Sequence, residues 1–274
     1  MFIPSPINAP VVLDMDAGGS LLDWLDARGH APLLLDWGRT TPSQRDENID
    51  EYVTRYAVPL LQSCQEPVHL VGYCLGGVIA MAAACLTQVK SLTLIASPWN
   101  FSAYSAQRRA ELAELWEGSK TICAHMGVVP MELVQQGFWS LSRSRLVQKY
   151  LDLADMDMDS DAFRKFVAIE DWANGGEPLP YAMGKQLFEQ FYALDRPGRN
   201  EWRIGDTLIS PDTLACPAYE IASSTDEIVP LACSPALKSR EVLTQGHVGM
   251  VVGNSAPQRL WQSLDSWFAS VESD

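Results

Sequence analysis

Residues 72–77, which read GYCLGG, combine a nucleophilic side chain with the glycines of a tight turn. An apolar run (68–71) precedes them, and a stretch rich in Ala, Met and Ile (78–86) follows. This order predicts a strand, a sharp turn and a helix, and the G-x-C-x-G centre is typical of a nucleophile elbow with cysteine in place of the usual serine. Glycines relieve the crowding of such a turn, and the helix directs its N–H groups and the positive end of its dipole at Cys74. We therefore expect Cys74 to react as a thiolate nucleophile.

A cysteine nucleophile needs a base, and the chain has four histidines. His247 follows the last expected strand, which is where an elbow nucleophile finds its base, so we expect it to be catalytic. The other three are expected to be structural, because they fall in a turn (His30), inside the elbow strand (His69) and in a helical region (His125).

The base needs an acid that orients it, and this acid should follow the preceding strand. Asp226 and Glu227 both lie there, just after residues 219–224. We favour Asp226, because residues 228–230 return the chain to burial and would set the direction of its carboxylate. Glu227 stays as the alternative acid, and a helix-capping role stays as the alternative for Asp226.

Attack of the thiolate on an acyl carbon creates an oxyanion that backbone N–H groups must stabilise. Leu75, at the start of the helix, is expected to supply one of them. The second should come from the loop after the first strand, near Ile7 or Asn8. The product is a thioester on Cys74, which stays an activated acyl group and can pass to an alcohol as well as to water.

The elements that must position these residues alternate between strand and helix. Such alternation predicts a mostly parallel sheet with helices on both faces, and together with the elbow it indicates an α/β-hydrolase fold. The expected strands cover 3–6, 31–35, 68–71, 89–96, 216–224 and 240–245, and the expected helices cover 20–28, 47–61, 78–86 and 256–271.

Between residues 99 and 212 the pattern changes to helical segments with several tryptophans and many charges. We interpret this stretch as a cap inserted over the carboxyl end of the sheet, where it would shape the pocket and exclude water. The chain then divides into a core of residues 1–98 and 213–274 and a cap of residues 99–212. An α/β-hydrolase normally has strands before the loop that completes the oxyanion hole, but Met1 already falls at that loop. Either the sheet is trimmed or, as we favour, the natural reading frame begins further upstream.

The composition disfavours several classes of protein. Hydrophobic residues make up 47% of the chain, which predicts a packed core, yet no run of about 18 apolar residues predicts a membrane span. Residues 1–10 lack the features of a signal peptide, so we expect a cytoplasmic protein. The net charge of −14 disfavours nucleic acid as a partner. The six cysteines show no metal-binding spacing, so we expect free thiols, no metal and no cofactor.

Two charged stretches of the expected cap suggest ligands. The acidic run 155–161 lacks the glycine and glutamate that a calcium loop needs, so a surface turn is the better interpretation. Basic residues could bind the pyrophosphate of coenzyme A, but solvated helix faces are the favoured explanation. They are Arg108, Arg109, Lys120, Arg143, Arg145, Lys149, Arg164 and Lys165.

Six segments, which occur along the chain in the same order as in the family, resemble the polyhydroxyalkanoate (poly-3-hydroxybutyrate) synthases of the α/β-hydrolase fold. The resemblance covers most of the chain. The elbow (72–77) matches the synthase box with its cysteine, and 226–230 and 246–247 match the acid and histidine segments. Three further segments are similar to the family's Pro-x-x-Ile-Asn loop, Asp-Trp-Gly signature and Asp-Asp-Tyr segment; they are 4–8, 36–38 and 50–53.

The resemblance implies acyl transfer from a 3-hydroxyacyl-CoA onto a growing polyester. Cys74 would carry the chain as a thioester, His247 would deprotonate Cys74, and Asp226 would orient His247 or activate the incoming 3-hydroxyl. It also implies a second synthase subunit or a homodimer as partner, and a place at the surface of polyester granules. The chain departs from the family at Glu227, where family members often carry histidine.

Two other functions are compatible with the same residues. An ester or thioester hydrolase would use the same Cys-His-Asp set with water as the acceptor. A truncated, non-catalytic protein would bind granules or a partner. Cysteine in place of serine favours the transferase, the expected missing strands favour the third function, and the intact set of Cys74, Asp226 and His247 argues against it.

Overall fold

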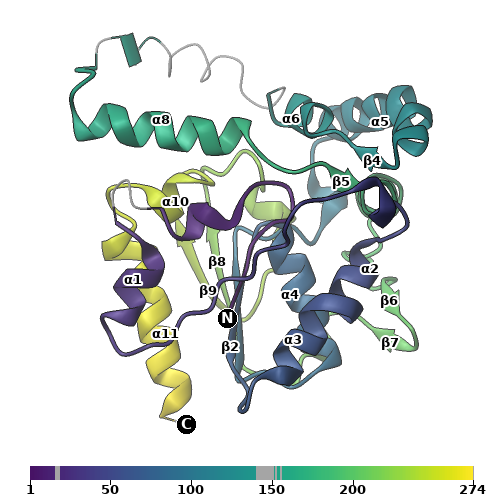
Figure 1. Ribbon diagram of the computed structural model, residues 1–274. Coiled ribbons are helices and arrows are strands. Elements are labelled where there is room, and N and C mark those ends of the chain that lie inside the picture. The colour runs from purple at the N-terminus through teal and green to yellow at the C-terminus, as the bar shows by residue number, and fades with distance from the viewer. Residues whose placement is uncertain (16–18, 140–150, 152, 155, 274) are drawn as a thin grey trace.

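The computed structural model describes residues 1–15, 19–139, 151, 153–154 and 156–273. A central sheet carries helices on both faces, and further helices lie across one of its ends (Figure 1). The five strands run in the order β1-β2-β3-β8-β9, and each neighbouring pair is parallel. This is the predicted α/β arrangement. The strands are β1 Phe2–Ile3, β2 His69–Tyr73, β3 Ser91–Ile95, β8 Ala218–Ser223 and β9 Ser239–Leu243.

The edge of the sheet beside β1 differs from the expected strand at 31–35. Only Leu34 forms an isolated parallel bridge, which pairs it with Phe2. The N–H of Phe2 donates to the carbonyl of Leu33 (2.7 Å), and its carbonyl accepts from the N–H of Leu35 (3.0 Å). The predicted strand is wrong. Because β1 is only two residues long, a neighbouring segment cannot form a longer ladder of hydrogen bonds with it.

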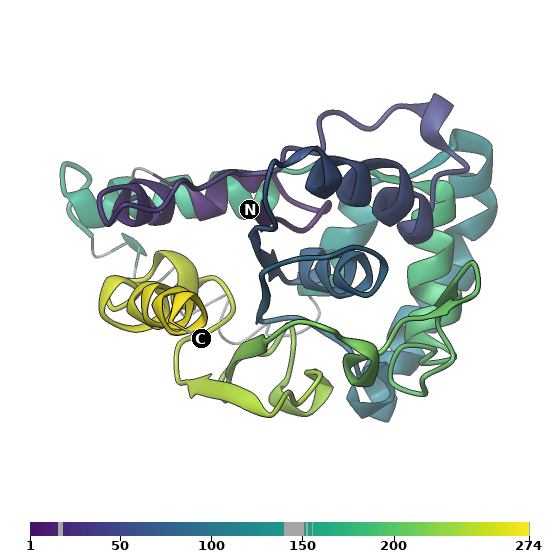
Figure 2. The same ribbon diagram turned by 90° about the horizontal axis from the view of Figure 1, so that it is seen from below.

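Alternate side chains of the strands point to opposite faces and build two separate buried clusters. Leu70 of β2 lies in the cluster on the side of α3 and α4, whereas Val71 lies in the cluster on the side of α1 and α11. Figure 2 shows these helices on either side of the sheet. They are α1 Leu21–Asp26, α2 Ile49–Glu51, a π-helical turn Tyr52–Ala57, α3 Val58–Ser63, α4 Leu75–Leu86, a π-helical turn Pro257–Trp261 and α11 Gln262–Glu272.

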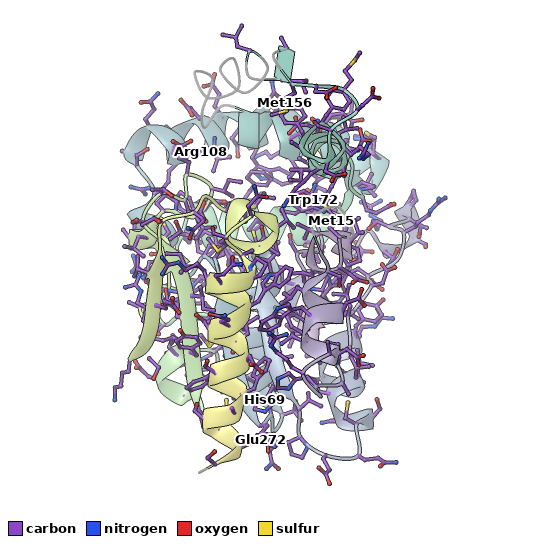
Figure 3. The ribbon with its side chains drawn as sticks, turned by 90° about the vertical axis from the view of Figure 1, so that its left-hand side faces the viewer. Met15, His69, Arg108, Met156, Trp172 and Glu272 are labelled. Atoms are coloured by element: carbon purple, nitrogen blue, oxygen red, sulfur yellow. The ribbon has the colours of Figure 1, made fainter. Side chains whose placement is uncertain are left out.

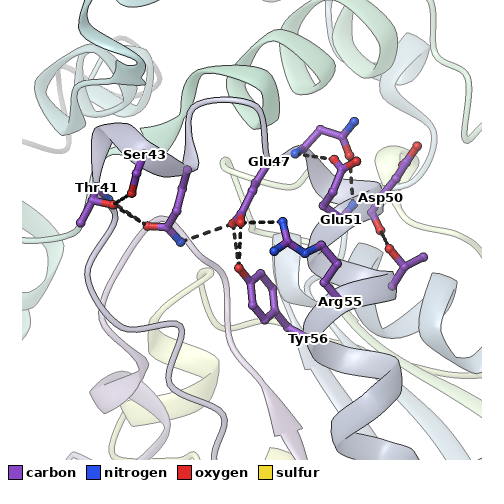
Figure 4. A network of polar contacts seen from close by, with 10 residues as sticks. Thr41, Ser43, Glu47, Asp50, Glu51, Arg55 and Tyr56 are labelled. Atoms are coloured by element: carbon purple, nitrogen blue, oxygen red, sulfur yellow. Dashed lines mark hydrogen bonds and ion pairs between the residues drawn. The ribbon is translucent and has the colours of Figure 1, made fainter.

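The continuous helical stretch from α2 to α3 begins in a network of polar contacts (Figure 4). Asn48 and Glu51 form a capping box, in which each side chain accepts a hydrogen bond from the other residue's N–H. Glu47 accepts hydrogen bonds from the Tyr56 hydroxyl and the Arg55 guanidinium, both at 2.9 Å. These contacts define the start of the helix and hold the preceding loop against its second turn.

Asp50 ties the same stretch to a distant part of the chain. Its Oδ1 accepts hydrogen bonds from the side-chain amide of Gln186 (2.7 Å) and the indole of Trp202 (2.9 Å). The side-chain oxygen Oε1 of Gln186 in turn accepts a hydrogen bond from the N–H of Ile49 (2.8 Å). Burial raises the pKa of Asp50, and the two hydrogen bonds to its carboxylate partly offset that rise. The Asp50 side chain therefore serves packing between these segments.

Residues 99–212 connect β3 to β8, two strands that are neighbours in the sheet. Its helices α5, α6 and α8 lie beyond one end of the sheet (Figure 1), and whether the stretch behaves as a separate cap stays a prediction. It contains a 3-10 turn Phe101–Ala103, α5 Ala106–Met126, β4 Val128–Val129, α6 Met131–Trp139, α8 Asp161–Asn174, β5 Leu179–Pro180, α9 Tyr181–Lys185, a π-helical turn Gln186–Tyr192, β6 Arg203–Ile204 and β7 Thr207–Leu208.

Among the described residues, none of the helices combines the length and apolar character needed to cross a membrane.

Short helical turns occupy several connections. The short helices are α10 Gly249–Val252 and 3-10 turns at Pro10–Leu13, Pro42–Gln44, Pro211–Thr213 and Leu231–Cys233.

The approach of α4 to β1 and β2 leaves no room for side chains at two glycines. A Cβ on Gly76 would lie 2.2 Å from the carbonyl oxygen of Ile3, and one on Gly72 would lie 2.4 Å from the Cα of Gly77. Both neighbours are backbone atoms, which cannot rotate away as a side chain can. The glycines of the elbow are therefore required by the packing of α4 on the sheet.

We expect Gly76→Ala to lower the free energy of unfolding by about 1–3 kcal/mol, the usual cost of overpacking. Gly118→Ala in the middle of α5 is the matched control, because no atom lies within 4 Å of the added methyl group. It should raise stability by about 0.5–1 kcal/mol through helix propensity. Urea unfolding of both variants measures the difference, and equal stabilities would contradict this account of the elbow.

Candidate active site

Cys74 lies in the turn between β2 and α4, at the carboxyl end of the central strands. Its backbone has φ 55° and ψ −127°, a conformation that non-glycine residues rarely adopt. Two hydrogen bonds hold it there: its N–H donates to the carbonyl of Ile95, and its carbonyl accepts from the N–H of Gly77, both at 2.9 Å. The strained turn carries a half-buried thiol between strand and helix, as the elbow pattern predicts.

His247 lies in the connection between β9 and α10, and its side chain is buried. Its Nδ1 is 2.6 Å from Oδ2 of Asp226, which leaves Nε2 for the nucleophile. Tyr73, the residue before Cys74, donates a hydrogen bond from its hydroxyl to the His247 carbonyl (3.3 Å), and its ring centroid lies 5.1 Å from that of the imidazole, with the two ring planes tilted by 35°. The elbow strand thus helps to position the histidine loop.

The structure brings Asp226, and not Glu227, to the histidine. The Asp226 carboxylate is fully buried, and its Oδ1 accepts hydrogen bonds from the N–H groups of Ile228 (2.8 Å) and Val229 (2.9 Å). Glu227 lies on the exposed surface beside it. The turn that follows Asp226 therefore orients its carboxylate, so that the second oxygen faces His247.

The protonation of His247 follows from its two neighbours. Burial by itself would lower the pKa of the imidazole, but the charge of Asp226, the proximity of Cys74 and hydrogen bonds to both raise this pKa to about 10. The pairing with Asp226 therefore favours the imidazolium over the neutral imidazole. A cationic histidine beside a cysteine, at the N-terminus of a helix, is the environment in which a thiolate is stabilised.

One of the two expected oxyanion donors lies at the start of a helix and the other in a loop. Leu75 is the first residue of α4, so its N–H is one of those that have no carbonyl partner within the helix. Ile7 follows β1, whose residue Ile3 pairs with Gly72 of the elbow strand. The Ile7 N–H donates to the Ser5 hydroxyl at 3.2 Å, so an oxyanion at this position would have to compete with that hydroxyl. The roles of both amides stay predictions.

Two tyrosines near Cys74 were not identified from the sequence. Burial raises the pKa of Tyr104 and of Tyr192, and the proximity of both hydroxyls to Cys74 adds to the effect. The Tyr104 hydroxyl donates to the carbonyl of Ile228 (3.0 Å), the residue whose N–H bonds Asp226. No local pattern distinguishes these tyrosines from core aromatics, since only the folded chain brings them to the site.

The other histidines lie outside this arrangement, as the sequence predicted. His69 bonds Ser91 (2.7 Å) and Glu272 (3.2 Å), and Figure 3 shows it at the end of the molecule opposite Trp172. His30 bonds Asp265, and His125 bonds a carbonyl within its own helix.

The charged stretches of the expected cap can be placed only in part. Asp155, Arg143, Arg145 and Lys149 lie outside the described residues. Two of the basic side chains form ion pairs along their own helices, Lys120 with Glu117 and Arg164 with Asp161. In the described part of the chain, no group of three His, Cys, Asp or Glu side chains could hold a metal ion.

The family model described as "Alpha/beta hydrolase family" matches residues 16–251, most of the chain and both the nucleophile and base segments. The chain belongs to the α/β-hydrolase family.

Two solved structures have the same fold. BpoC of Mycobacterium tuberculosis H37Rv superposes with a TM-score of 0.59 at 18% identity, covering 98% of this chain and 91% of that one. An extracellular α/β-hydrolase from a Paenibacillus species gives 0.58 at 12% identity, covering 95% of each chain. At these identities the likeness concerns the α/β-hydrolase fold alone.

The similarity to polyhydroxyalkanoate synthases is confirmed by curated relatives described as "Poly(3-hydroxyalkanoate) polymerase subunit PhaC". The relative from Haloferax mediterranei is 26% identical over 279 residues, which cover 96% of this chain and 57% of that protein. The relative from Allochromatium vinosum is 25% identical over 280 residues, covering 95% and 78%. This α/β-hydrolase chain therefore spans little more than half the length of the haloarchaeal relative.

We expect Asp226→Asn to reduce the rate of acyl-enzyme formation by roughly 100- to 10,000-fold, because a neutral amide neither stabilises the imidazolium nor holds the correct tautomer. Glu227→Gln is the matched control and should leave the rate unchanged. Pre-steady-state acylation of both variants provides the measurement. A larger loss in Glu227→Gln would exchange the roles of the two residues.

The raised pKa of His247 also predicts a pH dependence of stability. Because the folded pKa (about 10) exceeds the ordinary value of 6.5, the contribution of the imidazolium is complete below pH 6.5 and is lost as the pH rises through about 10. The stability difference between the wild type and His247→Gln should therefore shrink across this window. Urea unfolding at several pH values tests it, and parallel curves for the two proteins would be inconsistent with a paired imidazolium.

Proposed function

We propose that this protein is a polyhydroxyalkanoate synthase-like acyltransferase that forms a thioester on Cys74 from a 3-hydroxyacyl-CoA and passes the acyl group to a hydroxyl acceptor. The observation that carries the proposal is a cysteine in the elbow, beside a buried His247–Asp226 pair whose nitrogen and oxygen are 2.6 Å apart. The similarity to PhaC subunits over nearly the whole chain supports the choice of substrate.

In the first step the Cys74 thiolate attacks the thioester carbon of the acyl-CoA. The carbon–sulfur bond to coenzyme A breaks as the bond to Sγ of Cys74 forms, and the His247 imidazolium gives its proton to the departing thiolate. The amides of Leu75 and Ile7 stabilise the oxyanion between these events. The site is left with an acyl-enzyme and a neutral imidazole.

In the second step the neutral imidazole takes the proton of an incoming 3-hydroxyl group. The resulting oxygen nucleophile attacks the acyl-enzyme, an ester bond forms, and the Cys74 thiolate leaves beside the restored imidazolium. Asp226 stabilises the cation in each cycle because its carboxylate has no other orientation open to it. A thioester is a suitable intermediate for this transfer, since it reacts with alcohols as readily as with water.

The proposal includes the surroundings of the reaction. The acyl-CoA is a substrate and no cofactor takes part. A second synthase subunit or a second copy of this chain is the proposed partner, and the reaction takes place in the cytoplasm at the surface of polyester granules.

The second candidate is an ester or thioester hydrolase, which would use Cys74, His247 and Asp226 with water as the acceptor. Membership in the α/β-hydrolase family supports it. A non-catalytic granule- or partner-binding protein is the third candidate, and the buried, paired His247 makes it the least economical. The first two candidates differ in the acceptor of the acyl group, a hydroxyl group or water. A protein that turns over no acyl substrate would favour the third.

We expect the purified protein to convert 3-hydroxybutyryl-CoA into oligomeric esters, and Cys74→Ala to make none, because no other thiol lies in the elbow. Mass analysis of products and of the intact protein detects both the oligomers and the acyl-enzyme. Free 3-hydroxybutyrate in place of oligomers would identify the hydrolase. Cys74→Ser should shift the product ratio toward hydrolysis, and an acyl mass shift that persists in Cys74→Ala would refute the assignment of the nucleophile.

A further inference from the structure

The carboxyl-terminal end of α8 is capped by side chains from two other parts of the chain. A helix leaves its last carbonyl groups without partners of its own. The amide of Asn8 donates to the carbonyls of Trp172 (3.2 Å) and Gly175 (2.8 Å). The amide of Gln135, in α6, donates to those of Ala173 (3.5 Å) and Asn174 (2.5 Å). Two side chains therefore satisfy four consecutive carbonyls.

The same end of α8 also holds the backbone of the loop after β1. The Trp172 indole donates to the carbonyl of Ala9 at 2.8 Å, and the Trp172 carbonyl accepts from the Asn8 amide, so hydrogen bonds run in both directions between helix and loop. Figure 3 shows Trp172 beside Met15, where α8 contacts the N-terminal segment.

The chain that leaves α8 is pressed against the peptide of Ile7. Gly176 has φ 145°, and a Cβ there would lie 2.4 Å from the Ile7 carbonyl oxygen and 2.9 Å from the Met131 side chain. Only glycine allows this approach. The loop after β1 is thus held at two points: residues 3 and 4 lie on Gly76 of the elbow, and the carbonyl of Ile7, in the peptide unit that joins Ile7 to Asn8, lies on the end of α8.

We propose that Asn8 is a positioning residue for acyl transfer: its amide fastens the loop after β1 to the end of α8 and so fixes the backbone around Ile7, whose N–H is the expected second donor to the oxyanion. The inference rests on the proposed acyl chemistry at Cys74. It makes the position of α8 a determinant of reactivity, because a shift of α8 would move the loop with it. Gln135 and Trp172 act in the same assembly without touching the reacting atoms.

Two reactions of the same cysteine separate this role from a merely structural one. Acylation by p-nitrophenyl butyrate passes through an oxyanion, whereas alkylation by iodoacetamide displaces iodide at a methylene carbon and needs no oxyanion hole. Peptide mass analysis assigns the alkylation to Cys74 among the six cysteines. A misplaced loop should therefore slow acylation and leave alkylation unchanged.

The variant is Asn8→Asp, which replaces the donating amide with a carboxylate facing two carbonyl oxygens. We expect acylation to slow by about 10- to 100-fold, the usual effect of a displaced catalytic contact, with no change in alkylation. Asn174→Asp is the matched control: it makes the same chemical change on an exposed side chain at the same helix end, where the amide bonds Glu170 within α8. It should leave both rates unchanged.

Trp172→Phe provides an independent variant, since it keeps an aromatic ring and removes only the donor to Ala9. It should show the same selective loss of acylation, and it decides the question if Asn8→Asp does not fold. We call the hydrogen bonds of Asn8 and Trp172 between the loop and the end of α8 the Asn8 clamp. Equal losses in acylation and alkylation, or no loss in acylation, would overturn its proposed role. A wild type that is acylated by the ester but makes no oligomers would refute the proposed synthase activity and leave this test intact; a wild type that is not acylated would refute both.

Discussion

The close approach of residues 3–4, at the end of β1, to the turn at 72–77 and the first turn of α4 is the constraint on which the rest of the site depends. Gly76 lies directly beneath the carbonyls of Ile3 and Pro4, and Gly72 lies against Gly77. This contact allows the backbone of Cys74 to hold a positive φ and sets the N-terminus of α4 under the thiol. A wider separation would remove both the strain of the elbow and the helix dipole from the nucleophile.

The second constraint is the burial of charge. Asp226 and His247 lose their hydration in the folded chain, and their pairing, together with two backbone N–H donors to the carboxylate, compensates for that loss. Burial by itself lowers the pKa of His247, but the charge of Asp226 and its hydrogen bond to the imidazole, together with Cys74, raise this pKa to about 10. The pairing of Asp226 with His247 therefore both compensates for the burial of the two groups and contributes to the raised pKa of the histidine.

The layer formed by residues 99–212 reaches the site by two routes. Tyr104 bonds the carbonyl of Ile228, which links the start of this stretch to the turn that orients Asp226. The end of α8 contacts the loop that carries Ile7, through Asn8 and Trp172. The turn that orients Asp226 and the loop that carries Ile7 are therefore both held by a part of the chain that contributes no expected catalytic residue.

The amino-acid sequence by itself determined the α/β order, the elbow and the segments that carry Cys74, Asp226 and His247, because each depends on local signals: an apolar run, glycines at set spacings and a polar residue after a strand. It overestimated the strand at 31–35, since a strand exists only if its neighbour is long enough to pair with it. It could not choose Asp226 over Glu227 by contact, nor find Tyr104, Tyr192 or the Asn8 clamp. These depend on groups up to 167 residues apart in the chain, and only the tertiary structure decides which of them meet.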